Sequence, residues 1–177
     1  MNFIDLVNQE LQVLKEKSNG TYRKTQDVRD LSLRLFKRLD NHEISYVFSL
    51  VEELLKTDVW ACKIIAFDFA YRMRTKYSKE TFITFEQWLF KYIKDWWDCD
   101  DFCTHAFGEL FIRYPELIHR AYKWANHEKF AVRRALPVVL VLPIRKDHHQ
   151  KFDIFKISDL LIKDPHDLVQ KGYGWML

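Results

Sequence analysis

The sequence predicts an all-α protein whose helices pack in antiparallel pairs. Glycine and proline occur only four times each in 177 residues, and all-β folds need more of the turns that these residues provide. Apolar residues recur at intervals of three or four along most of the chain, and no segment alternates apolar and polar residues as a strand would. We therefore expect roughly ten helices joined by short loops.

The N-terminal part of the chain carries four of the expected helices. Each has an apolar stripe at helical spacing and is bounded by residues that favour helix ends. Asn19-Gly20 ends the first helix, the polar segment Thr21 to Gln26 indicates a loop, and Thr57-Asp58 caps the fourth helix. These helices are expected at residues 3–17, 27–39, 43–56 and 59–76.

The C-terminal part carries six further helices. Pro115 suits the first turn of a helix, whereas Pro137 lies inside an expected helix and should kink it. Gly172 and Gly174 each cost roughly 1 kcal/mol relative to alanine inside a helix, which indicates a close helix approach, an exposed Trp175 or a frayed end. These helices are expected at residues 78–94, 96–114, 116–126, 128–142, 152–163 and 166–177.

Helices of this size form either a bundle or a solenoid. Several pairs look alike, because a first helix with outward charge is followed by a tight polar turn and an apolar second helix. Arg29, Lys63 and Arg133 each lie a few residues into such a second helix. This pattern favours a HEAT-like repeat solenoid in which second helices line a concave basic groove. We expect residues 1–177 to form a single domain of this kind.

The composition restricts the cellular setting. A net charge of +3 permits nucleic-acid binding without requiring it. The first residues lack the basic and apolar regions of a signal peptide, and no stretch approaches the ~20 apolar residues of a membrane span. Cys62, Cys99 and Cys103 make no paired framework, so we expect an intracellular, reduced protein. The sequence offers them no CxxC or HxxxH partner, and we expect no metal site.

One stretch, Asp95 to Asp101, combines two adjacent tryptophans with four carboxylates. Asp95 suits the N-cap of a helix, and Asp98 lies three residues on, where it can answer the cap. Trp97 and Asp101 are then one turn apart on the same face. An indole beside a carboxylate near a helix N-terminus suits a flat or cationic ligand. The alternative is that Trp96 is core, Trp97 is a half-exposed packing residue and the acids form a solvated cap.

A pair of arginines, Arg133-Arg134, opens an apolar helix. Such a pair is either a clamp for a phosphate or carboxylate, or the intramolecular partner of acids such as Asp101. The sequence leaves both possibilities open. Other basic residues are scattered and are expected to form a solvated face or a ligand-facing set; they include Arg23, Lys24, Arg72 and Arg74.

Three segments, in this order and spacing, resemble the AlkD-like DNA alkylation repair family. They are residues 96–103 (WWDCDDFC), 129–136 (KFAVRRAL) and 169–175 (VQKGYGW). The members of this family are DNA glycosylases built from HEAT-like helical repeats. The resemblance extends over roughly residues 22–177, and it leaves open whether the chain is a shortened member or lacks the family's last helices.

The resemblance implies hydrolysis of the N-glycosidic bond of cationic alkylated purines, 3-methyladenine and 7-methylguanine, in duplex DNA, with no metal or nucleotide cofactor. Asp101 would stabilise the developing oxocarbenium sugar and orient a water. Trp97 and Trp175 would pack against the deoxyribose. Arg133, or Arg134 in its place, would hold a flanking phosphate. The expected DNA-binding residues are Arg133, Arg134, Lys63 and Arg29.

Two other functions stay open because a fold alone does not establish an activity. One is a non-catalytic HEAT-like protein that binds DNA, and the other is a helical scaffold that binds protein partners through its groove. For the leading function we expect a monomer in the bacterial cytoplasm, associated with the nucleoid when it is on DNA.

Overall fold

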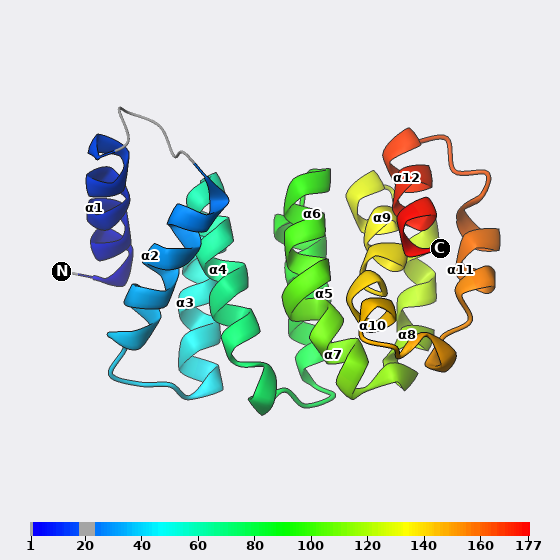
Figure 1. Ribbon diagram of the computed structural model, residues 1–177, viewed down its shortest axis with the longest axis horizontal. Helices are drawn as coiled ribbons and strands as arrows, with labels where there is room; N and C mark the ends of the chain where they lie inside the picture. The colour runs from blue at the N-terminus through cyan, green and yellow to red at the C-terminus, as the bar shows by residue number, and fades with distance from the viewer. Residues whose placement is uncertain (1, 18–23) are drawn as a thin grey trace. The chain divides into compact units, whose positions relative to one another are not determined.

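The computed structural model describes residues 2–17 and 24–177, and every regular element in these ranges is a helix (Figure 1). This confirms the all-α class. The described residues form two compact units, which we call the first unit, ending at Met73, and the second unit, beginning at Arg74. The expected end of the first helix at Asn19-Gly20 and residues 21–23 of the expected loop, which include Arg23, lie outside the described residues.

The first unit contains four helices close to those expected. They are α1 (Phe3–Glu16), α2 (Thr25–Lys37), α3 (Ile44–Lys56) and α4 (Trp60–Arg72). Helix α4 packs against both α2 and α3, and it is therefore buried without interruption from Ala61 to Ala70. This run includes Lys63 and Asp68, two residues that need polar partners at such depth.

Both buried charges of α4 have such partners. Asp68 accepts hydrogen bonds from Ser32 Oγ at 2.5 Å and from Arg72 Nε at 2.8 Å. Lys63 Nζ lies 2.8 Å from Asp58 Oδ1. Asp58 has a positive φ of 55°, and Val59, rather than Thr57-Asp58, is the N-cap of α4. The predicted cap was therefore wrong, because Asp58 takes a left-handed turn and pairs with Lys63.

The second unit is built around a cluster of aromatic side chains. Its longer helices are α5 (Thr81–Tyr92), α9 (Phe130–Val138), α11 (Ile154–Leu161) and α12 (Asp167–Met176). Its shorter helices are α6 (Trp96–Phe102), α7 (Gly108–Arg113), α8 (Ile118–Ala121) and α10 (Val141–Arg145). The core is made of rings at stacked, tilted and edge-to-face contacts, namely Phe82, Phe85, Trp88, Phe102, Phe107, Phe111 and Trp124.

Two segments of the second unit were each predicted as one continuous helix, but each is divided into shorter helices in the structure. The helix expected at 96–114 consists of α6, a π-helical turn at Cys103–Phe107 and α7. The helix expected at 128–142 ends at Val138, one residue after Pro137, and α10 follows from Val141. Helix α9 passes through Pro137, and the ladder continues beyond it with the Val139 N–H donating to the carbonyl oxygen of Ala135, so the kink expected at Pro137 stays a prediction.

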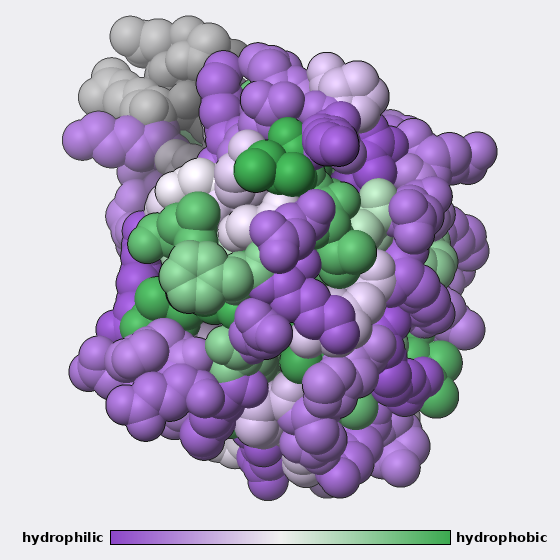
Figure 2. Space-filling model, turned by 90° about the vertical axis from the view of Figure 1, so that its right-hand side faces the viewer, coloured by the Kyte–Doolittle hydropathy of each residue, from purple (hydrophilic) through white to green (hydrophobic). Residues whose placement is uncertain are grey.

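Helix α11 and the residue that follows it leave apolar side chains on the surface. Phe155, Leu160 and Ile162 are all exposed, and apolar side chains are interspersed with polar ones on the face shown in Figure 2. None of the described helices has the length and apolar character needed to cross a bilayer. The HEAT-like solenoid and its basic groove stay predictions.

Candidate active site

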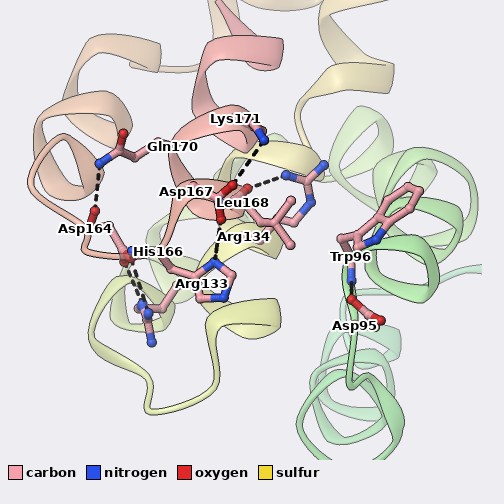
Figure 3. Close-up of polar contacts among 10 residues, drawn as sticks. All are labelled: Asp95, Trp96, Arg133, Arg134, Asp164, His166, Asp167, Leu168, Gln170 and Lys171. Carbon is pink, nitrogen blue, oxygen red and sulfur yellow. Dashed lines mark hydrogen bonds and ion pairs between the residues drawn. The ribbon is translucent and has the colours of Figure 1, made fainter.

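The first turn of α6 is fixed by the predicted capping box. Asp95 Oδ1 accepts a hydrogen bond from the Trp96 N–H at 2.7 Å (Figure 3). The Asp98 carboxylate accepts from the backbone N–H groups of Asp95 at 2.9 Å and Lys94 at 3.1 Å. Trp96 is 48% exposed, so the alternative in which it belongs to the core was wrong, whereas Trp97 is half-buried. The box satisfies backbone donors at the start of α6.

Asp100 forms a bidentate ion pair with Arg134 of α9. Arg134 Nε donates to Asp100 Oδ1 and Nη2 donates to Oδ2, both at 2.8 Å. The arginine side chain is only 7% exposed. Burial by itself lowers the pKa of the Arg134 guanidinium, but its hydrogen bonds to Asp100 outweigh burial and raise the pKa above its usual value. The pair joins α6 to α9.

The same guanidinium also reaches α12. Arg134 Nη1 donates to the carbonyl oxygen of Leu168 in the first turn of α12 (Figure 3). One turn later, a Cβ added at Gly172 would lie 3.3 Å from Arg134 Cγ and from Nη1. The predicted close helix approach at Gly172 is thus found against α9. Arg134 connects α6, α9 and α12 within the second unit.

Arg133 is held by the loop before α12. Its Nε donates to Asp164 Oδ2 at 2.6 Å and its Nη2 to Oδ1 at 3.2 Å, as Figure 3 shows. Its Nη1 donates to the carbonyl oxygens of His127 at 2.8 Å and Glu128 at 2.9 Å. Burial raises the pKa of the Asp164 carboxyl, but the hydrogen bonds from Arg133 and from the backbone of His166 lower it below its usual value overall.

Of the two possibilities left open for Arg133-Arg134, the structure favours intramolecular pairing. Arg133 pairs with Asp164, and Arg134 pairs with Asp100. Neither arginine pairs with Asp101, the acid that the sequence suggested as an example. Each guanidinium nitrogen of the two arginines donates a hydrogen bond within the second unit. Their predicted contact with a DNA phosphate finds no support in this arrangement.

Asp101 lies next to Asp100 but has a different environment. Its side chain is 10% exposed, and its Oδ1 lies 3.4 Å from Nδ1 of His105. The carbonyl oxygen of Asp101 lies closer to the same nitrogen, at 2.9 Å. Asp101 is also four residues after Trp97, so the two side chains share a helix face as predicted. The contact with His105 was not predicted, although the spacing of four between Asp101 and His105 in the sequence is a signal for it.

Trp175 lies near the end of α12. Its side chain is 40% exposed, and the guanidinium carbon of Arg145 lies 5.4 Å from the ring centroid. The helix extends to Met176, so Trp175 belongs to a regular turn and not to a frayed end. A half-exposed indole with a cation over one face can pack against a ligand.

The remaining two expected residues belong to the first unit. Arg29 is half-buried in α2. Lys63 is 3% exposed and pairs with Asp58, so its expected DNA contact does not fit its position. The second unit thus contains Trp97, Asp101, Arg133, Arg134 and Trp175 on three helices, with Arg134 bonded to the other two.

These observations define an all-helical protein whose second unit presents a carboxylate, half-exposed indoles and arginines held in ion pairs. Residues 15–177 match the model of a family described as DNA alkylation repair enzyme. This match covers most of the chain, and the protein belongs to that family. Comparison with curated proteins and with solved structures found no match.

Proposed function

We propose that this DNA alkylation repair enzyme is a DNA glycosylase that hydrolyses the N-glycosidic bond of cationic alkylated purines in duplex DNA. The observation that carries the proposal is the contrast between two neighbouring acids of α6. Arg134 neutralises Asp100, whereas Asp101, the acid that shares a face with Trp97, lies beside the histidine His105. Family membership supports DNA as the substrate.

The proposed reaction needs little acid catalysis. An N3- or N7-alkylated purine carries a positive charge, so when the bond between C1′ and the purine nitrogen breaks, the electron pair leaves with a neutral base. The deoxyribose becomes an oxocarbenium ion. The Asp101 carboxylate would stabilise that cation and orient a water, whose oxygen bonds to C1′ and whose proton is released to solvent.

The indoles would bind the sugar. Trp97 and Trp175 present aromatic faces, to which a developing cation is attracted. Arg133 and Arg134 would act indirectly, by holding α9 to the elements that carry the acid and the second indole. We assign no phosphate contact to either arginine. The same proposal includes a monomeric enzyme in the bacterial cytoplasm that acts without a metal or nucleotide cofactor.

The test is release of free base from alkylated DNA. We expect the wild-type protein to release 7-methylguanine or 3-methyladenine from methylated duplex DNA, measured by chromatography and mass spectrometry. Asp101→Asn should reduce the single-turnover rate by about 100-fold or more while duplex affinity and thermal midpoint stay close to wild type. Asp159→Asn, which alters an exposed acid on α11, is the matched control and should retain full activity.

Each alternative function has its own outcome in this test. A wild-type protein that binds duplex DNA but releases no base would be a non-catalytic DNA-binding protein, and the glycosylase proposal would be wrong. A protein with no affinity for DNA at low salt would fit the helical scaffold instead. Full activity in Asp101→Asn would leave base release intact but remove Asp101 from the mechanism.

A further inference from the structure

His105 lies one turn after Asp101, inside the π-helical turn at Cys103–Phe107. Its Nδ1 lies near three oxygen atoms. They are the carbonyl oxygen of Asp101 at 2.9 Å, Oγ1 of Thr104 at 3.2 Å, and Oδ1 of the Asp101 carboxylate at 3.4 Å. Two of these oxygens belong to the acid that the proposed function places at the sugar.

The chemistry of these oxygens determines where the imidazole carries its hydrogen. A carbonyl oxygen only accepts hydrogen bonds, and so does an ionised carboxylate. The Thr104 hydroxyl donates its hydrogen to the carbonyl oxygen of Asp100 at 2.8 Å, so it too can only accept from His105. Three acceptors around one nitrogen require a donor there. We therefore assign the Nδ1–H tautomer to His105 from its hydrogen-bond network.

The π-helical turn places His105 in this position. The Gly108 N–H donates to the carbonyl oxygen of Cys103, five residues earlier, where an α-helix would use a partner four residues earlier. A Cβ at position 108 would lie 2.8 Å from that oxygen and 3.0 Å from Cβ of Leu142, so only glycine fits. Wider turns of this kind occur frequently at functional sites.

We propose that His105 is a positioning residue for Asp101, an inference that rests on the proposed function. The Nδ1–H group donates to the Asp101 carbonyl oxygen and lies 3.4 Å from Oδ1, so its partial positive charge favours the negative charge of the carboxylate and one orientation of it. The imidazole carries hydrogen on Nδ1 in this neutral tautomer and also when it is protonated, so the contact does not depend on the charge of His105. Because the His105 side chain is 41% exposed, replacing it leaves no buried cavity.

A pair of variants of the same size separates this role from packing. His105→Asn retains an N–H donor near the Nδ1 position, whereas His105→Leu has a similar shape and no donor. We expect His105→Leu to lower the single-turnover rate of alkylpurine release by about tenfold or more, with unchanged duplex affinity. His105→Asn should recover most of that rate. Equal rates in the two variants, whether high or low, would overturn the positioning role.

A second measurement decides the contact without any activity. Nitrogen-15 NMR of the histidines should show His105 as the Nδ1–H tautomer, and the carboxyl carbon-13 signal of Asp101 should shift in His105→Leu but much less in His105→Asn. An Nε2–H tautomer, or an Asp101 signal unchanged in His105→Leu, would overturn the inference. A wild-type protein that shows both NMR signatures but releases no base would instead refute the glycosylase proposal alone.

Discussion

Asp100 and Asp101 have the same side chain and adjacent positions, but they occupy different environments. Successive residues of a helix point about 100° apart, so Asp100 meets Arg134 of α9 whereas Asp101 meets His105 of the following turn. One acid is used in an ion pair between helices, and the other is placed beside a histidine donor. The single step along α6 therefore separates a structural role from the proposed catalytic one.

A residue-scale prediction concerns the pH dependence of stability. The pKa of Asp164 is lowered in the folded protein, where burial opposes and Arg133 favours the charged form. An acid of this kind contributes stability that is present above its unfolded pKa of about 3.9 and is lost as the pH falls through the folded pKa. We expect Asp164→Asn to lose about 1.5–3 kcal/mol of unfolding free energy at neutral pH, measured by urea denaturation.

On acidification below about pH 4, the wild-type protein should approach the stability of Asp164→Asn. The sign follows from linkage, because the unfolded state binds a proton at Asp164 before the folded state does. Asp159→Asn, at an exposed position of α11, provides the control and should follow the wild-type curve. A difference between wild type and Asp164→Asn that stays constant from neutral pH to well below pH 4 would show that the ion pair with Arg133 is not its source.

At the scale of helices, sequence patterns predicted which segments are helical and which face of each helix is buried better than they predicted where each helix ends. The apolar spacing of α1 to α4 and the capping box of α6 depend on neighbours within a few residues, and both were found as expected. The π-helical turn was missed because it depends on packing of Gly108 against Leu142 of α10. The partners of Arg133 and Arg134 lie 31 and 34 residues away, and spacing could not select them among 25 acidic residues.

The two glycines of α12 give a matched prediction at this scale. A Cβ at Gly172 would meet Arg134 at 3.3 Å, whereas one at Gly174 would meet nothing within 4 Å. Alanine is favoured over glycine in a helix by up to about 1 kcal/mol. Gly174→Ala should therefore raise the unfolding free energy by about 0.5–1 kcal/mol, whereas Gly172→Ala should gain less or lose stability because Arg134 must shift.

Chemical denaturation of the two glycine variants measures this difference, and base release measures its consequence. Movement of Arg134 would disturb its bonds to Asp100 and Leu168, so Gly172→Ala should also slow alkylpurine release while Gly174→Ala does not. Equal gains in stability in both variants would mean that α12 does not approach α9 as closely as the structure indicates.

At the scale of the whole molecule, the charge is modest and much of it is already paired. The net charge is only +3, and Lys63, Arg133 and Arg134 each have a carboxylate partner within their own unit. The sequence alone could not reveal this, because a basic residue in an amphipathic helix has the same pattern whether it faces a ligand or an acid. Arg29 is half-buried in α2, and its contact with DNA stays a prediction.

The salt dependence of DNA binding tests which basic residues meet phosphate. The logarithm of the binding constant falls with the logarithm of salt concentration by about 0.9 for each phosphate neutralised. Removing a residue that contacts a phosphate should make this slope shallower by about one. We expect that change in Arg29→Gln, measured by fluorescence anisotropy on an undamaged duplex. Lys63→Met should leave the slope unchanged, because the Lys63 ammonium is buried against Asp58.

A slope altered by Lys63→Met at an unchanged thermal midpoint would show that this lysine reaches DNA after all, whereas a slope unaltered by Arg29→Gln would place the phosphate contacts on other residues.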